Sequence, residues 1–545
     1  MERAINTTHD TEQAALFAAA WSRLDAALTS ERYDDVAEVI RRHWFDLLSG
    51  PAHELTVALE RVPAHELDRR PLIVALLGRS TLTLARRRVH GLRRMGQAGA
   101  ALDRPAHGMR GLDRAIIQTN QADLHRMLGR PDRARTSART ALAELEALPD
   151  AEARGNETVG GLYAQLAACL LDTGADADAL DAAERALLHA QTLGDSAAPA
   201  IFATLAGLNA TTGELASARE NIHAARSQGR PLRQEDLVLL RLAEAMVALD
   251  ELDATAAQAH LFEAEVEADS EAGVEAAIQA QAEAPPTAHW MPAILIAGMV
   301  ELVGGYPGRG LARLEQSARA RGPEGRTDAA RRALAPLRAV LQCALGNPDA
   351  AAAILDRDAG PSVVGCIGHA RLELMRGRHG AALQQLRPLS GSVMSIRQQA
   401  EASALEAAAL LRFSTERRTT AVVDHLGAML QHSRLLLPLA LLPASDLLRV
   451  SAALTTGGYG ELVAHGRLRS LLYDLEAEDP LTPRETAVLA TLLEHPSHAA
   501  IAARLNVSVN TVKSQLRSVY RKLGVKTRDE AIAIALERHL LTERD

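Results

Sequence analysis

The stretch Ser497–Leu523 reads SHAAIAARLNVSVNTVKSQLRSVYRKL, and it predicts two helices separated by a tight turn. Ser497 can cap a short first helix that ends near Leu505. Asn506-Val507-Ser508 has the composition of a turn. A longer helix is expected over Val509–Leu523. A short helix, a tight turn and a longer helix form the order of a helix-turn-helix unit.

The longer helix is two-sided. Its apolar residues recur at intervals of four, three and four, which predicts one buried stripe made of Val512, Leu516, Val519 and Leu523. The opposite face carries Lys513, Ser514, Arg517 and Arg521. A helix of this kind can pack on its own domain and present its basic face to the major groove of DNA. A small helical bundle with a cationic surface is the alternative.

Two further helices are expected around this unit. Thr482-Pro483-Arg484-Glu485 combines a capping threonine, a proline at the first helical position and a glutamate that can close a capping box. The helix that it opens should run to about Leu493, before His495-Pro496. Thr527-Arg528-Asp529-Glu530 is a second capping box, and it opens a last helix. The module therefore has four predicted helices.

Charge is distributed unevenly along the chain. The 545 residues carry a formal net charge of −8, yet the window from Arg504 to Arg528 holds seven basic residues and no acidic one. The rest of the chain therefore carries −15. A basic patch at one end of an otherwise acidic protein is what phosphate binding requires.

Lysine is confined to the same window, as Lys513, Lys522 and Lys526. A phosphate-binding Gly-Lys-Ser/Thr loop is therefore absent from the sequence, as are the lysines of a protein kinase and of a phospho-receiver domain. No catalytic motif stands out, so we expect no enzyme, no cofactor and no metal site. The three cysteines are scattered, and with an N-terminus unlike a signal peptide they favour a cytoplasmic protein without a membrane span.

A repeated pattern fills residues 110 to 390. A glycine is followed five residues later by alanine or glycine, and apolar helical segments flank both. The instances are Gly129/Ala134, Gly174/Ala179, Gly213/Ala218, Gly305/Gly310, Gly346/Ala351 and Gly377/Ala382, and Glu251/Ala256 is expected to fill the gap without a glycine. Glycine can end one helix in a left-handed conformation, and the small residue lets the next helix pack closely.

These hairpins predict an all-α protein whose repeats form an α-solenoid, since each unit leaves an apolar face for the next to cover. Only 3% of residues are aromatic, so alanine and leucine must do the packing. Residues 11 to 95 also have helical periodicity, and Pro285-Pro286 marks a break. We expect repeats over 1–473, an acidic linker over 474–480 and a DNA-binding domain over 481–545.

Three parts of the sequence resemble known families. LTPRE, followed by IAARLNVSVNTVKSQLRSVYRKLGVKTRDEAIAIA, resembles the LuxR-type helix-turn-helix domain over Leu481 to about Ala535. The repeats resemble tetratricopeptide-type hairpins, although most spacings exceed the usual ~34 residues. Arg61–Gly78 resembles the start of the repeat region in large LuxR regulators of the maltose-regulator type. Those proteins carry an ATPase module upstream, and we expect this chain to resemble one without it.

The LuxR resemblance implies roles for particular residues. Base edges would be read by Lys513, Ser514 and Arg517, and phosphates would be held by Thr511, Arg521 and Lys522, with Asn510 and Gln515 also in the interface. The last helix would pair across a two-fold axis through Ala531, Ile532, Ala535 and Leu536. The chain departs from the family at Pro496, at Ala499-Ala500 and at Gln515, where the family often has Gly, Lys-Glu and His. Region 4 of a sigma factor is the alternative for the module.

Taken together, these patterns predict a sequence-specific transcription regulator. Double-stranded DNA, self-association on DNA, RNA polymerase and an unidentified effector or partner protein of the repeats are the expected partners. A protein–protein adaptor with only weak DNA binding is the alternative function, and salt-dependent preference for a palindrome would separate the two.

Overall fold

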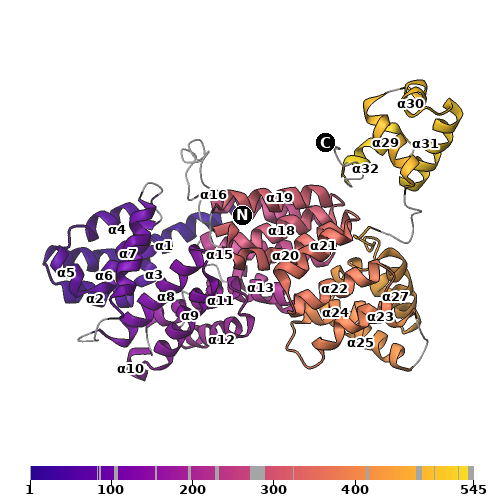
Figure 1. Cartoon of the computed structure of the whole chain (residues 1–545). Helices are drawn as coiled ribbons and strands as arrows, with labels where there is room; N and C mark the ends of the chain where they lie inside the picture. Colours follow the sequence, from indigo (N-terminus) through magenta and orange to yellow (C-terminus); the bar gives the residue numbers. More distant parts are fainter. Residues whose placement is uncertain are drawn as a thin grey trace. The chain divides into compact units, whose positions relative to one another are not determined.

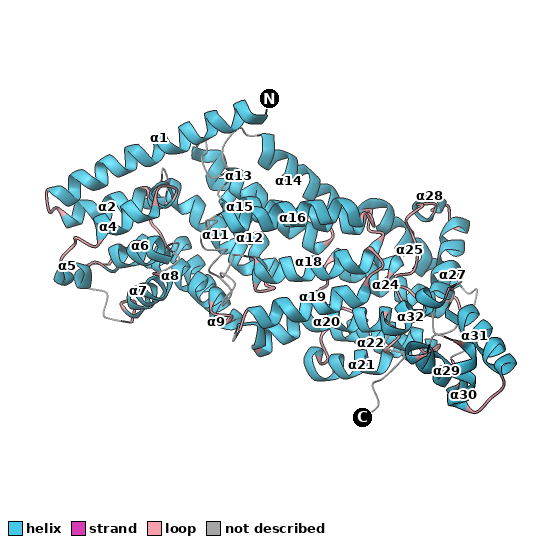
Figure 2. Cartoon of the chain, turned by 90° about the horizontal axis from the view of Figure 1, so that it is seen from above, coloured by secondary structure: helices cyan, strands magenta, loops and turns pink. Residues whose placement is uncertain are grey.

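Helices make up the regular structure of this protein. The computed structural model describes residues 2–82, 84, 87–103, 109–153, 156–193, 198–227, 232, 234–270, 289–322, 324–412, 417–473, 481–495, 497–523, 525 and 527–537. Within these ranges every regular element is helical and there is no β-strand (Figure 1, Figure 2). The all-α prediction is therefore confirmed for the described residues.

The first half of the chain contains a succession of mostly short helices. They are α1 (Glu2–Thr29), α2 (Tyr33–Arg42), α3 (Trp44–Leu48), α4 (Ala52–Leu59), α5 (Ala64–Arg69), α6 (Pro71–Leu82), α7 (Arg88–Ala100), α8 (Gly111–Met127), α9 (Pro131–Glu146), α10 (Asp150–Ala153), α11 (Glu157–Asp172), α12 (Asp176–Leu193), α13 (Ala198–Thr212), α14 (Leu215–Ser227), α15 (Gln234–Asp250) and α16 (Ala254–Ser270). From α6 onward many consecutive helices pack as pairs, as in α6 with α7, α8 with α9, α11 with α12 and α13 with α14.

The helical pairs continue in the second half. Its elements are α18 (Trp290–Val303), α19 (Pro307–Ala320), η1 (Glu324–Arg326), α20 (Asp328–Ala344), α21 (Pro348–Ile354), η2 (Leu355–Ala359), α22 (Val363–Met375), α23 (His379–Leu386), η3 (Arg387–Leu389), α24 (Ile396–Leu410), α25 (Arg417–Ser433), α26 (Leu437–Ala440), α27 (Ala444–Thr456) and α28 (Gly460–Val463). The last four helices are α29 (Pro483–Glu494), α30 (His498–Leu505), α31 (Val509–Leu523) and α32 (Arg528–Glu537). Pro285-Pro286 and the expected linker 474–480 lie outside the described residues.

The chain divides into two compact units. One comprises residues 1–248, 256–296 and 317–330, and the other comprises residues 249–255, 297–316 and 331–545. The predicted repeat region thus contributes to both units. Among the described helices, none combines the length and the apolar composition that crossing a bilayer requires.

The repeat pattern read from the sequence corresponds to a recurring turn. All six predicted glycines have positive φ, from 63° at Gly129 to 97° at Gly213. After Gly174, Ala175 donates its N–H to the Leu170 carbonyl, five residues earlier, at 2.9 Å. The residue after each of the other five glycines makes the same hydrogen bond to the carbonyl five residues before it. This bond satisfies a carbonyl that the end of a helix leaves unpaired. Ala134, Ala179, Ala218, Ala351 and Ala382 are all buried.

The prediction for the gap in the series was wrong by one residue. Leu252, with φ of 58°, is in the left-handed conformation there, and Ala257 is the fully buried small residue five positions later. Glu251 and Ala256 are only partly buried. Leu252 is itself buried, so packing of its side chain offsets the conformational cost of left-handed backbone at a leucine.

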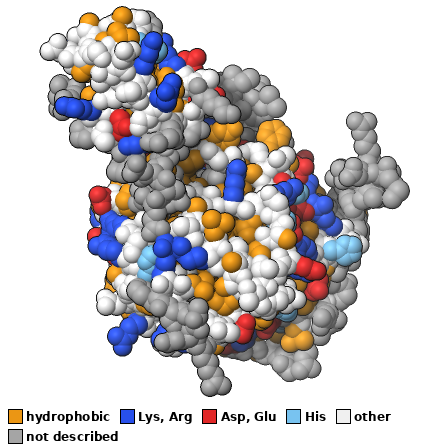
Figure 3. Space-filling model, turned by 90° about the vertical axis from the view of Figure 1, so that its right-hand side faces the viewer, with side chains coloured by type: hydrophobic (Ala, Val, Ile, Leu, Met, Phe, Trp, Pro, Cys, Tyr) orange, Lys and Arg blue, Asp and Glu red, His pale blue; other side chains and the backbone are white. Residues whose placement is uncertain are grey.

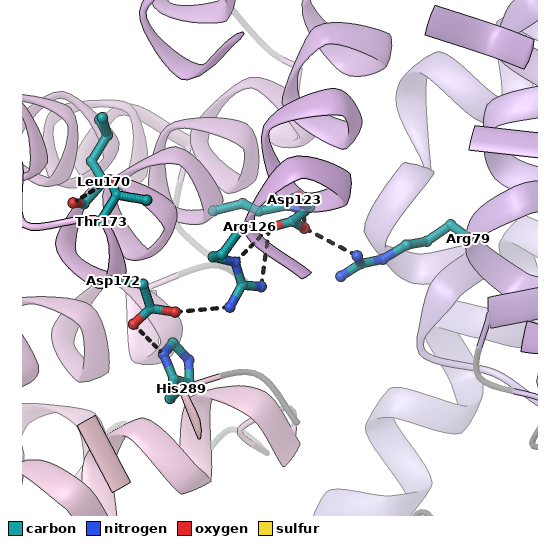
Figure 4. A network of polar contacts seen from close by, with 8 residues as sticks. Arg79, Asp123, Arg126, Leu170, Asp172, Thr173 and His289 are labelled. Atoms are coloured by element: carbon teal, nitrogen blue, oxygen red, sulfur yellow. Dashed lines mark hydrogen bonds and ion pairs between the residues drawn. The ribbon is translucent and has the colours of Figure 1, made fainter. Parts of the chain in front are cut away.

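A buried polar network ties helices of the first unit together (Figure 4). Arg126 of α8 contacts Asp123 at 3.1 Å and Asp172 of α11 at 2.8 Å. Arg79 of α6 reaches Asp123 at 3.0 Å, and His289, just before α18, reaches Asp172 at 2.9 Å. Burial opposes ionisation of both aspartates, but Arg126 with Arg79, and His289 with Arg126, lower the pKa of Asp123 and Asp172. Buried charges need such partners.

A buried ion pair also joins distant segments in the second unit. Arg397 of α24 makes two contacts of 2.6 Å with the carboxylate of Asp250, at the end of α15, and Asp250 has no exposed surface. The Leu436 N–H donates to the Asp250 carbonyl at 3.0 Å. Removing Arg397 would take both of these contacts from the fully buried Asp250 carboxylate, so this pair helps to fix how three segments far apart in the sequence meet.

Candidate nucleic-acid interface

The last four helices share a core of their own. The predicted stripe of α31, made of Val512, Leu516, Val519 and Leu523, is at most 3% exposed. It packs with Val488, Leu489 and Leu492 of α29, Ile501 and Ala502 of α30, and Ala531 and Ala535 of α32. The helix boundaries agree with those expected from the sequence to within one residue for the first three helices.

Side-chain caps begin these helices as predicted. Thr482 and Glu485 form a complete capping box at the start of α29, and Ser497 accepts the Ala500 N–H at the start of α30. Thr527 and Glu530 form the reciprocal pair of bonds at the start of α32. Each cap satisfies backbone N–H groups that would otherwise lack a partner.

The turn between α30 and α31 is held on both sides. Asn506 adopts a left-handed conformation with φ of 52°, and the Val507 N–H donates to the Ala502 carbonyl at 3.0 Å. Ser508 then accepts the Thr511 N–H at 3.1 Å, and its hydroxyl lies 2.8 Å from the Thr511 hydroxyl. These bonds fix where α31 begins and therefore which of its side chains face outward.

The face of α31 opposite the buried stripe is open to solvent. Asn510, Lys513, Ser514 and Arg517 are exposed, and Thr511 and Gln515 are half-buried. Ser514 donates its hydroxyl to the Thr511 carbonyl at 3.1 Å. The backbone of Arg521 belongs to α31, but its side chain lies outside the described part of the chain. The structure thus places the two predicted cationic base readers one helical turn apart on one exposed face.

Lys522 is placed differently from its predicted neighbours. Its ammonium lies 2.8 Å from the Glu485 carboxylate of α29, and its side chain is only 10% exposed. Burial alone would raise the pKa of Glu485, but hydrogen bonds from Lys522, Ser518 and Thr482 lower it to about 2. This geometry favours a role for Lys522 in joining α31 to α29. Sequence reasoning missed the pairing because the partners are 37 residues apart.

Arg528 has a comparable structural role that the sequence did not reveal. Its guanidinium donates to the Leu492 carbonyl near the end of α29 at 2.9 Å. A cation at this position also interacts favourably with the negative end of the helix dipole. Arg504, at the end of α30, is exposed. Among the basic residues between Arg504 and Arg528, Lys522 and Arg528 therefore hold helices of the module together. At least three others, Arg504, Lys513 and Arg517, are exposed to solvent.

Acidic residues are distributed in a way that suits a phosphate-facing surface. The first turn of α29 contains Glu485, and that of α32 contains Asp529 and Glu530, but α30 and α31 have no acidic residue there. An acidic residue at a helix N-terminus normally stabilises the helix, whereas beside a phosphate it would repel. In the space-filling view, Lys and Arg side chains stand out on the upper lobe, which is this module (Figure 3).

The residues expected to pair two copies of the module are partly inaccessible. Ala531 and Ala535 have no exposed surface and belong to the module's own core, and Ile532 is half-buried against it. The Leu536 side chain lies outside the described residues. Self-association through α32 therefore stays a prediction, and Ile532 is the described residue best placed to take part.

Comparison with known proteins supports the interpretation of these last helices. Residues 479–535 match the family of bacterial regulatory proteins, luxR family. The chain is 45% identical over 65 residues to the transcriptional regulatory protein YdfI of Bacillus subtilis (strain 168), a match that covers 12% of this chain. It is 47% identical over 78 residues, 13% of this chain, to the probable transcriptional regulatory protein SgaR of Hyphomicrobium methylovorum.

A further similarity is to the HTH-type transcriptional regulator MalT of Klebsiella pneumoniae (strain 342), at 39% identity over 59 residues, 11% of this chain and 6% of that protein. The matches cover 30% of YdfI and 36% of SgaR, so the chain spans about a third of the length of these two relatives. The C-terminal module is a LuxR-type helix-turn-helix domain, and it is preceded by a helical repeat region.

Proposed function

We propose that this chain is a sequence-specific transcription regulator. Its C-terminal domain, residues 481–545, binds double-stranded DNA with α31 in the major groove, and the repeats over 1–473 bind an effector or a partner protein. The chain acts without catalysing a reaction, in the cytoplasm, and it contacts RNA polymerase when bound to its site.

The exposed face of α31 carries this proposal. Lys513 and Arg517 lie one turn apart near the start of the helix, opposite the stripe that anchors it, and no acidic side chain occupies the first turn. In helix-turn-helix proteins the start of the second helix contacts base edges, and Arg or Lys pairs with guanine there. The matched relatives carry names of transcriptional regulators, which agrees with this function.

Competition binding tests the proposal directly. Full-length protein is used to select duplexes from fragmented genomic DNA, and Lys513→Ala and Arg517→Ala variants are then measured on the selected duplex and on random duplex. We expect each substitution to weaken binding to the selected duplex by about 1–3 kcal/mol and to relax sequence preference. Arg93→Ala, which removes an exposed arginine of α7, is the matched control and should leave both affinities unchanged.

The adaptor function makes the opposite prediction for the same experiment. An adaptor would yield no preferred duplex, because its binding energy would lie in protein contacts of the repeats. If selection yields no preferred sequence, or if the Lys513 and Arg517 variants behave like the Arg93 control, the regulator proposal is wrong and the adaptor becomes the better account.

A further inference from the structure

Val507, in the turn before α31, and Val509, the first residue of α31, are both exposed. Val507 is 39% exposed and Val509 is 40% exposed. These two exposed valines fall within three residues of each other. A single exposed valine is ordinary on a protein surface. A pair next to the two exposed cations of α31 suggests contact with a partner.

The position of Val509 is fixed by its surroundings. The preceding turn is held by the Val507 N–H bond to Ala502 and by the cap that Ser508 provides for α31. Val509 is the first residue of that helix. Because a valine in a helix strongly prefers one side-chain rotamer, its methyl groups occupy a defined place relative to the helix axis.

Val509 also shares a face with the cationic residues. Residues four apart on a helix are neighbours, so Val509, Lys513 and Arg517 form one exposed row. All three residues are exposed. Val509 lies where this row meets the edge of the buried stripe, because it is three residues before Val512. The row begins with an apolar group at the end of the helix that enters a groove first.

Valine gives this helix no advantage in water. The first helical positions favour acidic side chains, which interact with the helix dipole, and α29 and α32 both have them. Valine supplies no charge and no capping group, and as a β-branched residue it is a weaker helix former than alanine. Val509 continues the spacing of the buried stripe, yet 40% of its surface stays exposed beside Lys513, where a bound partner would cover it.

The major groove offers one prominent apolar group, the C5-methyl of thymine. We propose that Val509 is a specificity-determining residue of the interface and contacts a thymine methyl next to the base read by Lys513. This inference rests on the proposed function. It implies that each half-site contains a thymine at one fixed position, and that the methyl group, rather than a hydrogen bond, is read there.

Deoxyuridine tests this inference, because it differs from thymidine only by lacking that methyl group. Duplexes selected by the full-length protein are resynthesised with each thymine replaced in turn. With wild-type protein, we expect one replacement per half-site to weaken binding about threefold to tenfold, the effect of removing one buried methyl group. This part of the test uses unaltered protein, so folding of a variant cannot confuse it.

A double-mutant cycle then assigns the effect to one side chain. Val509→Ala should weaken binding to the thymine duplex by a similar factor and should be insensitive to the deoxyuridine replacement. Val507→Ala, the matched control from outside the helix, should keep the full wild-type sensitivity to the methyl group. The cycle is measured at one salt concentration, since affinity for DNA depends strongly on salt.

The outcomes separate this inference from the function on which it rests. If selection yields a preferred sequence but no thymine methyl matters, or if the methyl matters equally in Val509→Ala, the inference is wrong and the regulator function stands. If selection yields no preferred sequence, the proposed function fails and the inference fails with it.

Discussion

At the scale of single residues, the ion pair between Lys522 and Glu485 illustrates what local sequence patterns reveal and what they miss. The capping role of Glu485 follows from its place three residues after Thr482, and the structure confirms it. Its second partner, Lys522, is 37 residues away and is brought near only when α29 and α31 pack together. Local sequence patterns contain no such long-range pairing, so they did not reveal that Lys522, expected at the phosphate backbone, also joins two helices.

The lowered pKa of Glu485 predicts how the domain responds to acid. Because the pKa falls from 4.5 to about 2 on folding, the carboxylate stabilises the folded domain above pH 4.5, and this contribution is lost as pH falls toward 2. The full shift corresponds to about 3 kcal/mol, and solvent screening reduces the expected loss to about 1–2 kcal/mol. Hydrogen exchange of α29 and α31 amides, corrected for intrinsic rates, measures it.

Glu485→Gln is the matched variant for this measurement, since it keeps the shape of the side chain and removes its titration. We expect its local stability to be lower at neutral pH and nearly flat between pH 4.5 and 2. Parallel pH profiles for the wild-type protein and the variant would show that Glu485 does not carry the effect.

At the scale of helices and turns, glycine was the most informative residue. Six glycines predicted from spacing alone all have positive φ, because few other residues adopt that conformation without cost. Leu252 adopts the same left-handed conformation, but nothing in the sequence marks it. The pattern therefore placed this turn one residue too early, at Glu251. A left-handed turn is therefore predictable from sequence where the turn requires glycine. It is not predictable where packing of another side chain, such as that of Leu252, offsets the cost of the same backbone conformation.

Substitution of Gly174 measures the free-energy cost of a left-handed backbone at a residue other than glycine. Its φ is 72°, and a Cβ added there would meet no other atom within 4 Å, so Gly174→Ala should destabilise α11 and α12 by about 1–2 kcal/mol through backbone strain alone. Gly96→Ala is the control, because that position also has open space but lies in α7 without a positive φ. It should be neutral or stabilising. Equal stability of both variants, measured by hydrogen exchange, would contradict the strain argument.

The same scale decides how two copies of the domain could meet. A charge at Ala535 would unfold the core, since this residue has no exposed surface, so Ile532→Glu is the better probe of the proposed two-fold contact. We expect Ile532→Glu to weaken binding to a palindromic duplex more than binding to a half-site, as measured by gel shift. Equal losses on both duplexes would argue against a dimer contact at α32.

At the scale of the whole molecule, the main feature is that basic charge is concentrated in the C-terminal module, while the rest of the chain is acidic. The window from Arg504 to Arg528 carries seven basic residues, and the remaining residues carry a net −15 within a total of −8. A chain of this kind should be attracted to DNA through one small domain while its repeats are repelled, which leaves the repeats available for other partners. The sequence predicted the helical class well. It could not predict which repeats associate into the two compact units, because that depends on contacts between distant segments such as Asp250 and Arg397.

The most direct test of the central claim is the affinity of the full-length protein for selected and random duplex across a range of salt concentrations. A DNA-reading regulator predicts that the selected duplex is bound about a thousandfold or more tightly than random duplex. It also predicts that the logarithm of affinity falls linearly with the logarithm of salt concentration, and that Arg521→Ala lowers this slope by about one on both duplexes. Equal affinity for the two duplexes, or binding that does not change with salt, would contradict the claim.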